Sequence, residues 1–150
     1  MSPKLGSLTR TLPRARPVSL RGAWFAVAGD QIATEAVGAL AGTSFEIDDA
    51  HRAAYHAAAC IAANHLVALL GQVERIGSGA GAPFEAYLDL VRGAVDNVAA
   101  LGPAAALTGP AARGDETTIA GHLAAIDPSE HDAYRTMADQ ARRLAARRKD

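Results

Sequence analysis

The chain has 150 residues, a formal net charge of −1 and one cysteine, Cys60. This length suits a single domain with a hydrophobic core, and the balanced charge gives no electrostatic reason to expect a nucleic-acid partner. One cysteine excludes an intrachain disulfide, which favours a reducing, cytoplasmic compartment. Hydrophobic residues make up 49% of the chain but aromatic residues only 5%, because alanine dominates, and alanine-rich segments favour helix.

Residues 1–19 are predicted to be irregular, because they contain three prolines and no hydrophobic periodicity. No apolar run of signal-peptide length occurs in them. Every charged side chain before Asp30, the first acidic residue, is basic. Such a composition is typical of organellar transit peptides. The prolines argue against the amphipathic helix that such a peptide needs.

A strand–helix–strand pattern follows. Residues 23–28 predict a buried strand, residues 31–40 a short helix, and residues 43–47 a second strand. Asp30 suits the N-cap of this helix, and Gly42 stands just past its end. Two short strands do not form a stable sheet by themselves, so we expect them to belong to the edge of a larger sheet.

A long helix is predicted over residues 49–76. Asp48 or Asp49 caps it, and the Gly-Ser-Gly sequence at 77–79 ends it. Residues 53–70 are almost wholly small or apolar and reach the length of a membrane span. The polar side chains within that stretch disfavour insertion into a membrane, so we expect a buried core helix instead.

Three polar residues interrupt this apolar stretch: His56, Asn64 and His65. On an α-helix, His56 and Asn64 lie about 80° apart on one side, and His65 points to the opposite side from His56. His56 suits a general acid or base, or a group that orients a substrate carbonyl; the alternative is a core histidine hydrogen-bonded to the backbone, to Tyr87 or to Tyr134. For Asn64, the alternative is a structural tie between helices.

Metal binding has weak support. His56 and Cys60 have the i, i+4 spacing of a ligand pair, but no second pair follows, since His122 and His131 are isolated. In its apolar setting, Cys60 is expected to act as a small hydrophobic residue, because burial raises the pKa of a thiol.

The remainder is predicted to be helical. Helices are expected from Pro83 to about residue 101, over residues 116–126 with Asp115 as N-cap, and from about residue 129 to residue 148, with a short helical turn at 104–107. The basic residues near the C-terminus suit the end of a helix.

The loop at residues 107–115 is the other unusual element. Arg113 and Asp115 predict either an ion pair that pins the loop or a site in which the arginine reaches a substrate carboxylate or a cofactor phosphate. No G-x-G-x-x-G motif follows a strand, and the glycines at 77–81 follow a helix instead.

Two motifs carry a resemblance. Tyr55-His56-Ala-Ala leading to Asn64, together with the sequence Leu-Thr-Gly-Pro-Ala-Ala-Arg-Gly-Asp at 107–115, resembles a helical domain of unknown function. That domain follows a Rossmann-like NADP-binding domain in bacterial oxidoreductase-like proteins related to ketopantoate reductase and 6-phosphogluconate dehydrogenase. The resemblance covers about residues 20–147.

The resemblance implies a mainly α fold, a helical bundle of the 6-phosphogluconate dehydrogenase C-terminal type with a short strand–helix–strand remnant at its N-terminus. It divides the chain into an irregular segment (1–19), a remnant of the edge of a Rossmann-like domain (20–48) and a helical substrate and dimerisation domain (49–150).

The resemblance also implies a function: the substrate-side and dimerisation domain of an NADP-dependent oxidoreductase. The substrate is a small molecule in the cleft between the two domains, and the helical domain supplies a homodimer interface. The positions that match the family's polar residues are His56 and Asn64 for catalysis, and Thr108, Arg113, Asp115 and His122 for substrate binding. Related enzymes use a lysine and an asparagine on the first long helix; this helix has no lysine, so His56 would take that role.

The cofactor half of the family is absent from this sequence. We therefore expect NADP to bind the complete family architecture and not this chain alone, and the chain's own catalytic activity stays open. The chain is expected to be a C-terminal piece, from a truncated gene or a shifted start, or the partner of a separate nucleotide-binding chain. The alternative function is a non-catalytic helical dimerisation or interaction module, without a nucleic-acid or membrane partner.

Overall fold

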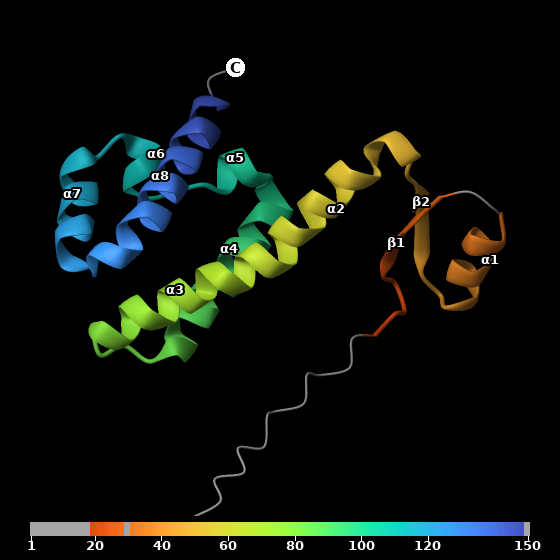
Figure 1. Cartoon of the computed structure of the whole chain (residues 1–150), viewed down its shortest axis with the longest axis horizontal. Helices are drawn as coiled ribbons and strands as arrows, with labels where there is room; N and C mark the ends of the chain where they lie inside the picture. The colour runs from red at the N-terminus through yellow and green to blue at the C-terminus, as the bar shows by residue number, and fades with distance from the viewer. Residues whose placement is uncertain (1–18, 29–30, 149–150) are drawn as a thin grey trace, which may run out of the picture. The chain divides into compact units, whose positions relative to one another are not determined.

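The computed structural model describes residues 19–28 and 31–148. Asp30, the predicted N-cap, lies outside these residues, as does the predicted irregular segment apart from its last residue. The described chain is mainly helical with a short pair of parallel strands near its N-terminal end (Figure 1), as predicted. It forms two compact units, residues 1–58 (the N-terminal unit) and residues 59–150 (the C-terminal unit).

The N-terminal unit contains one strand–helix–strand motif. Strand β1 (Trp24–Val27) and strand β2 (Thr43–Glu46) are parallel, and α1 (Gln31–Ala39) connects them. Both strands lie where the sequence predicts them, but the predicted burial of the first is wrong, because Trp24 is 70% exposed. Phe25, Ala26 and Val27 are half-buried. Parallel sheets are normally covered on both faces, and this two-stranded one leaves part of its apolar surface in solvent.

The end of α1 has the hydrogen bonds of a Schellman motif. The N–H of Gly42 donates to the carbonyl of Val37 at 3.1 Å, and the N–H of Ala41 donates to the carbonyl of Gly38 at 2.9 Å. The left-handed residue of this motif is Ala41, with φ of 54°, and not the neighbouring glycine. An L-residue other than glycine is strained in this conformation.

Four segments make up the long helix, and the first begins at the predicted cap. The Asp48 carboxylate accepts the N–H of Ala50 at 2.9 Å. The segments are η1 (Asp49–His51), α2 (Arg52–Cys60), the π-helical η2 (Ile61–His65) and α3 (Leu66–Gly79). The helix continues through Gly79, because the predicted Gly-Ser-Gly terminator keeps helical geometry.

The π-helical segment corrects one prediction. The N–H of Leu66 reaches the carbonyl of Ile61, five residues back, so the helix is wider here than an α-helix. His56 precedes this segment and Asn64 lies inside it. The 80° separation assumed uninterrupted α-helical winding, so that angle does not apply to this pair.

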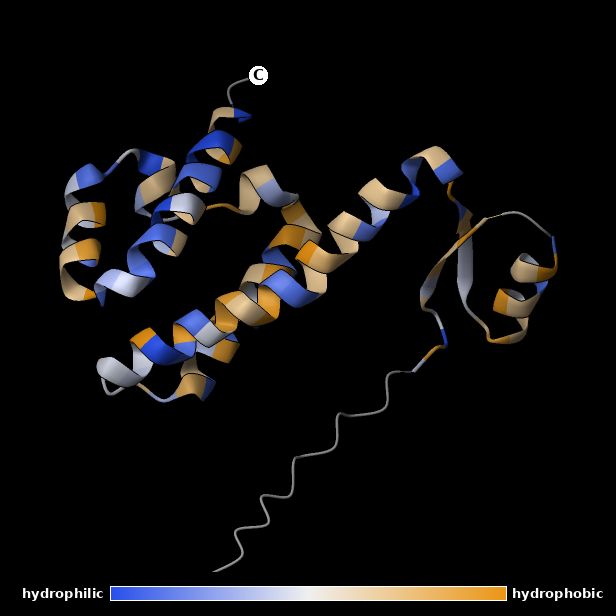
Figure 2. Ribbon diagram, viewed as in Figure 1, coloured by the Kyte–Doolittle hydropathy of each residue, from blue (hydrophilic) through white to orange (hydrophobic). Residues whose placement is uncertain are grey.

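The predicted burial of the long helix is also wrong. Residues 52–68 are exposed except for the half-buried Cys60, although Figure 2 shows hydrophobic colours along much of this stretch. By length and composition alone, the helix Asp49–Gly79 is apolar enough to cross a membrane, with a mean hydropathy of 1.4 over an 18-residue window of which nothing is buried. One such helix is weak evidence for membrane insertion. The apolar composition predicts that this helix packs against other apolar groups, but it does not identify those groups.

The C-terminal unit continues from η2 and α3. Its further elements are α4 (Phe84–Leu101), α5 (Pro103–Ala106), α6 (Pro110–Arg113), α7 (Glu116–Ala125), η3 (Pro128–Glu130) and α8 (His131–Ala146). Helices α3 and α4 form a hairpin in which the ring of Tyr87 lies against Gly77; a Cβ on this glycine would be 2.5 Å from the ring. A larger residue at this position in α3 would displace the Tyr87 ring, so the glycine allows the close packing of this hairpin.

Polar ties connect the elements of this unit. The buried Gln72 on α3 donates to the backbone carbonyl of Glu130 at 3.2 Å, and Arg75 donates to the carboxylate of Glu130 at 2.5 and 3.1 Å. Near the C-terminus, Arg148 donates to the carbonyls of Ala104, Ala105 and Leu107. The basic C-terminal end is thus partly used for specific contacts, beyond matching the helix dipole.

Candidate functional site

A cavity of about 390 Å³ lies within the C-terminal unit. Residues of α3, α4, α6 and α8 line it, and most of its wall is apolar, including Leu69, Val73 and Met137. Four polar side chains also line it: Gln72, Tyr87, Thr108 and Tyr134. None of its described lining residues is charged, so this cavity offers neutral hydrogen-bonding groups among apolar walls.

Three residues that carry hydroxyl groups line this cavity from different parts of the fold. Tyr87 comes from α4, where its ring packs on Gly77 of α3. Thr108 precedes α6, between two short helices that each begin with a proline, a favourable first residue of a helix. Tyr134 lies in the first turn of α8. The turns that connect these elements therefore fix where the hydroxyls lie.

Tyr134 is paired with a histidine of α7. Nδ1 of His122 lies 2.6 Å from the hydroxyl oxygen of Tyr134. The two rings meet edge to face, with their centroids 5.8 Å apart and an interplanar angle of 88°. His122 is exposed while Tyr134 is half-buried, so this pair connects the solvent to the cavity wall.

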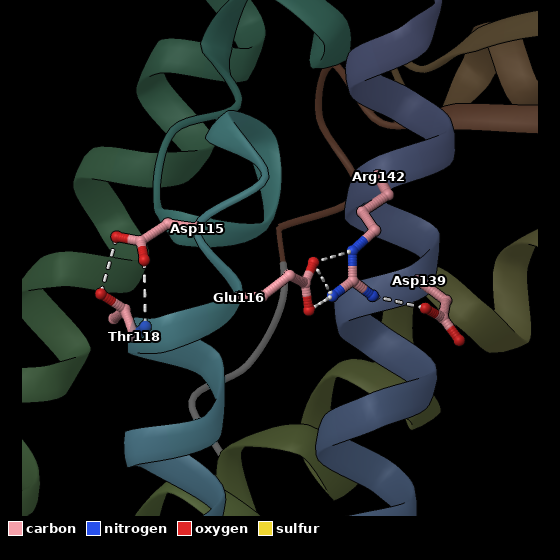
Figure 3. Close-up of polar contacts among 5 residues, drawn as sticks. All are labelled: Asp115, Glu116, Thr118, Asp139 and Arg142. Carbon is pink, nitrogen blue, oxygen red and sulfur yellow. Dashed lines mark hydrogen bonds and ion pairs between the residues drawn. The ribbon is translucent and has the colours of Figure 1, made fainter.

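An ion pair holds α7 and α8 together in the same unit (Figure 3). Arg142 of α8 donates to both carboxylate oxygens of Glu116 at 2.7 and 2.8 Å, and also to Asp139 at 2.6 Å. The hydrogen bonds to Glu116 raise the pKa of Arg142 above its ordinary value. The two-oxygen contact fixes geometry as well as charge.

Asp115 serves as the N-cap of α7, as predicted (Figure 3). Its carboxylate accepts the N–H of Thr118 at 3.0 Å and the hydroxyl of Thr118 at 2.7 Å. These hydrogen bonds lower the pKa of Asp115, and the charges of Arg113 and His122 lower it further. Within the described part of the chain, Arg113 and Asp115 form no ion pair within 4 Å, so the loop-pinning ion pair predicted as one alternative is not formed.

The structure brings the four predicted substrate-binding residues to one region of the C-terminal unit. Thr108 lines the cavity, His122 contacts Tyr134 at the cavity wall, and the charges of Arg113 and His122 both act on Asp115. Arg113 itself is exposed on α6 and does not line the cavity. The predicted catalytic residues lie elsewhere in the chain and do not line this cavity: His56 is exposed on α2 in the N-terminal unit, and Asn64 is exposed in η2.

A smaller hollow of about 340 Å³ lies in the N-terminal unit, beside the carboxyl ends of β1 and β2. Val27, Ala28 and Ile47 line it together with Arg52 and Tyr55. Ligands of open α/β sheets bind at this edge. The one cation here among the described residues, Arg52, already pairs with Asp49 at 2.5 Å, and no glycine-rich turn follows β1 in the sequence, so these residues do not form a phosphate cradle.

Residues 19–28 and 31–148 contain no group of three or more histidine, cysteine, aspartate or glutamate side chains placed to hold a metal ion. Among these residues, no third side chain is therefore placed to bind a metal ion together with His56 and Cys60.

Sequence patterns did not identify Tyr134, Tyr87 or the Gln72–Arg75–Glu130 cluster as parts of a site. The sequence offers Tyr134 only as a hydrogen-bond partner for His56, and the structure shows Tyr134 in contact with His122 instead. The two residues are twelve positions apart, with a proline-started turn between them. No spacing rule for a single helix predicts such a contact.

Comparison with known proteins gives a family and two similar structures. The family described as a domain of unknown function, DUF2520, matches residues 24–141. A solved protein of Bacteroides fragilis named as a candidate NADP oxidoreductase is 25% identical, with a TM-score of 0.64 over 72% of this chain and 43% of that one. A protein of Thermotoga maritima is 27% identical, with a TM-score of 0.69 over 85% of this chain and 55% of that one. The chain therefore spans about half the length of these structures, and no curated protein matches it.

Proposed function

Because this chain belongs to the DUF2520 family, we propose that it is the substrate-side and dimerisation domain of an NADP-dependent oxidoreductase related to ketopantoate reductases. The observation that carries this proposal is the likeness to the Bacteroides fragilis candidate NADP oxidoreductase, which extends over 72% of the chain at 25% identity. The fold is thus related to that of a protein named for this cofactor.

We place the dinucleotide outside this chain. The sequence lacks a G-x-G-x-x-G motif after a strand, and the hollow beside β1 and β2 does not supply a phosphate cradle. The longer similar structures contain sequence that this chain does not match, which is where the proposal assigns NADP.

The C-terminal unit supplies the substrate side in this proposal. Its cavity has the size and apolar lining of a small-molecule site, with Thr108 and Tyr134 in its wall. Asn64 lies in a π-helical segment, a geometry that is frequent at functional sites. We keep His56 and Asn64 as catalytic candidates and Thr108, Arg113, Asp115 and His122 as substrate-binding candidates in the complete enzyme.

Exposed apolar side chains support the dimerisation role. Several large ones on η2, α3 and α4 are more than half exposed: Ile61, Val67, Leu90, Val95 and Leu101. A groove of about 780 Å³ between α3 and α8 adds Leu66, Leu69 and Met137 to the apolar surface. Soluble proteins rarely leave large contiguous apolar patches uncovered. A second copy of the chain is the proposed cover, and a cytoplasmic protein without nucleic-acid or membrane partners is the proposed context.

The same surface favours the second candidate, a non-catalytic helical dimerisation or interaction module. That module would dimerise through this surface without binding any substrate in the complete protein. Turnover of the complete enzyme distinguishes the two candidate functions. If the chain is the substrate-side domain of an oxidoreductase, His56→Ala or Asn64→Ala should lower turnover more than stability. Equal loss of fold and activity would favour a structural role for these residues.

A further inference from the structure

We propose that the cavity beside Tyr134 binds a small, uncharged carbonyl compound, with the Tyr134 hydroxyl donating a hydrogen bond to the carbonyl oxygen and His122 positioning that hydroxyl. This inference rests on the proposed function, because it names the substrate class of the same site. The cavity lining and the contact between Tyr134 and His122 support it.

The size and lining of the cavity define the ligand class. Its volume of about 390 Å³ lies within the range of small-molecule sites, about 300–1,000 Å³. Leu69, Val73, Ile76 and Met137 supply apolar walls, and none of the described lining residues is charged. An ionised carboxylate or ammonium would lose its hydration here without gaining a counter-charge, so charged ligands are disfavoured.

The polar groups of the wall suit a neutral ligand that forms hydrogen bonds. Tyr87, Thr108 and Tyr134 each carry a hydroxyl, which donates one hydrogen bond and also accepts. Gln72 already donates to the carbonyl of Glu130, so its amide is partly occupied. A carbonyl oxygen, which only accepts, uses the donor side of these hydroxyls.

His122 determines whether Tyr134 is able to donate. With the proton on Nδ1, the imidazole donates to the tyrosine oxygen 2.6 Å away, and the tyrosine O–H remains for the ligand. Successive donors in such a chain polarise and strengthen one another. Because His122 is exposed and does not line the cavity, it acts through Tyr134 as a positioning residue.

Binding of three matched probes to the full chain tests this inference. Acetophenone carries a carbonyl, ethylbenzene has the same ring without an oxygen, and benzoate is an anion of similar size. Titrations followed by NMR of the ¹⁵N-labelled chain should give tighter binding of acetophenone than of either other probe. Tyr134→Phe should weaken acetophenone binding by about 2- to 10-fold and leave ethylbenzene unchanged, since one hydrogen bond is removed. Tyr55→Phe, in the N-terminal unit, is the matched control and should leave all three affinities unchanged.

A second pair of variants tests the positioning role. His122→Ala should lower the ratio of acetophenone to ethylbenzene affinity, and His122→Asn, which restores an N–H donor near the Nδ1 position, should recover it. A merely structural histidine would change both affinities alike. Equal binding of acetophenone and ethylbenzene, tightest binding of benzoate, an unchanged Tyr134→Phe variant, or no binding of any probe would overturn the inference. The assay contains no dinucleotide, so its failure is distinguishable from failure of the proposed oxidoreductase role.

Discussion

Nδ1 of His122 lies 2.6 Å from the hydroxyl oxygen of Tyr134, and this contact joins α7 to the first turn of α8 across η3. The same two helices are joined further along by the ion pair of Glu116 with Arg142. The position of Tyr134 at the cavity wall thus depends on how α7 and α8 are held together.

The ion pair gives the first prediction. Arg142→Ala removes contacts to Glu116 and Asp139, so the midpoint of thermal unfolding of the C-terminal unit should fall. Arg143→Ala, at the neighbouring arginine of α8, is the matched control and should leave the midpoint unchanged within error. Circular dichroism at 222 nm measures both. Equal effects of the two substitutions would show that the ion pair does not stabilise the α7–α8 packing.

Three carboxyl groups give a prediction about acid stability. Hydrogen bonds from Thr118, Ser129 and Arg75 lower the pKa values of Asp115, Asp127 and Glu130, respectively. A lowered folded-state pKa contributes stability that is present above the unfolded pKa, about 4 to 4.5, and is lost as pH falls through the folded value. The unfolding midpoint should therefore fall steeply below about pH 4.5.

Glu130→Gln tests the acid prediction at one group. Near pH 7 the variant should be less stable than the wild type, because the introduced amide lacks the charge that pairs with Arg75. As pH falls through the folded pKa of Glu130, the difference between variant and wild type should shrink toward zero. Thermal unfolding from pH 7 to pH 3 measures this difference. A difference that stays constant over that range would contradict the assigned role of the carboxylate.

The end of α1 gives a prediction about backbone strain. Ala41→Gly should raise the free energy of unfolding of the N-terminal unit by about 0.5–1 kcal/mol, because Ala41 has φ of 54° and glycine adopts this conformation without strain. Ala36→Gly, at an exposed position in the interior of α1, is the control and should lower it by about the same amount. The fluorescence of Trp24, the single tryptophan, reports unfolding of this unit in urea. Destabilisation by Ala41→Gly would contradict the Schellman assignment.

The exposed apolar surface gives a prediction about assembly. The wild-type chain should sediment as a dimer at micromolar concentration, and the double variant Val67→Glu, Leu101→Glu should sediment as a folded monomer. These side chains are 69% and 61% exposed, so the charges should not disturb the fold of one copy. Thr117→Glu, exposed on α7, should leave the dimer intact. A wild-type chain that is strictly monomeric would contradict the dimerisation role.

Local signals in the sequence predicted most elements. Apolar runs and turn residues predicted β1 and β2, and capping residues predicted the starts of the long helix and of α7 at Asp48 and Asp115. These features depend on residues within four positions of each other, which is the range over which sequence periodicity and capping act. Gly42 was expected past the end of α1 and is found there, but the left-handed residue is Ala41.

Features that depend on distant residues were not predicted. The π-helical turn of η2 has no signature in the sequence, and it removed the α-helical spacing on which the face of His56 and Asn64 depended. The contact of Tyr134 with His122 depends on how α7 and α8 pack. The predictions that Trp24 and the long helix are buried were wrong. Apolar composition indicates that a segment tends to pack against other apolar groups, but it does not identify those groups.

NADPH binding tests the proposed function most directly. Isothermal titration calorimetry should be performed on this chain alone and on a version extended at its N-terminus by the dinucleotide-binding half of the Bacteroides fragilis candidate oxidoreductase. We expect saturable NADPH binding to the extended protein and little or none to the chain alone. An extended, folded protein that binds no NADPH would contradict the assignment of this chain to an NADP-dependent oxidoreductase.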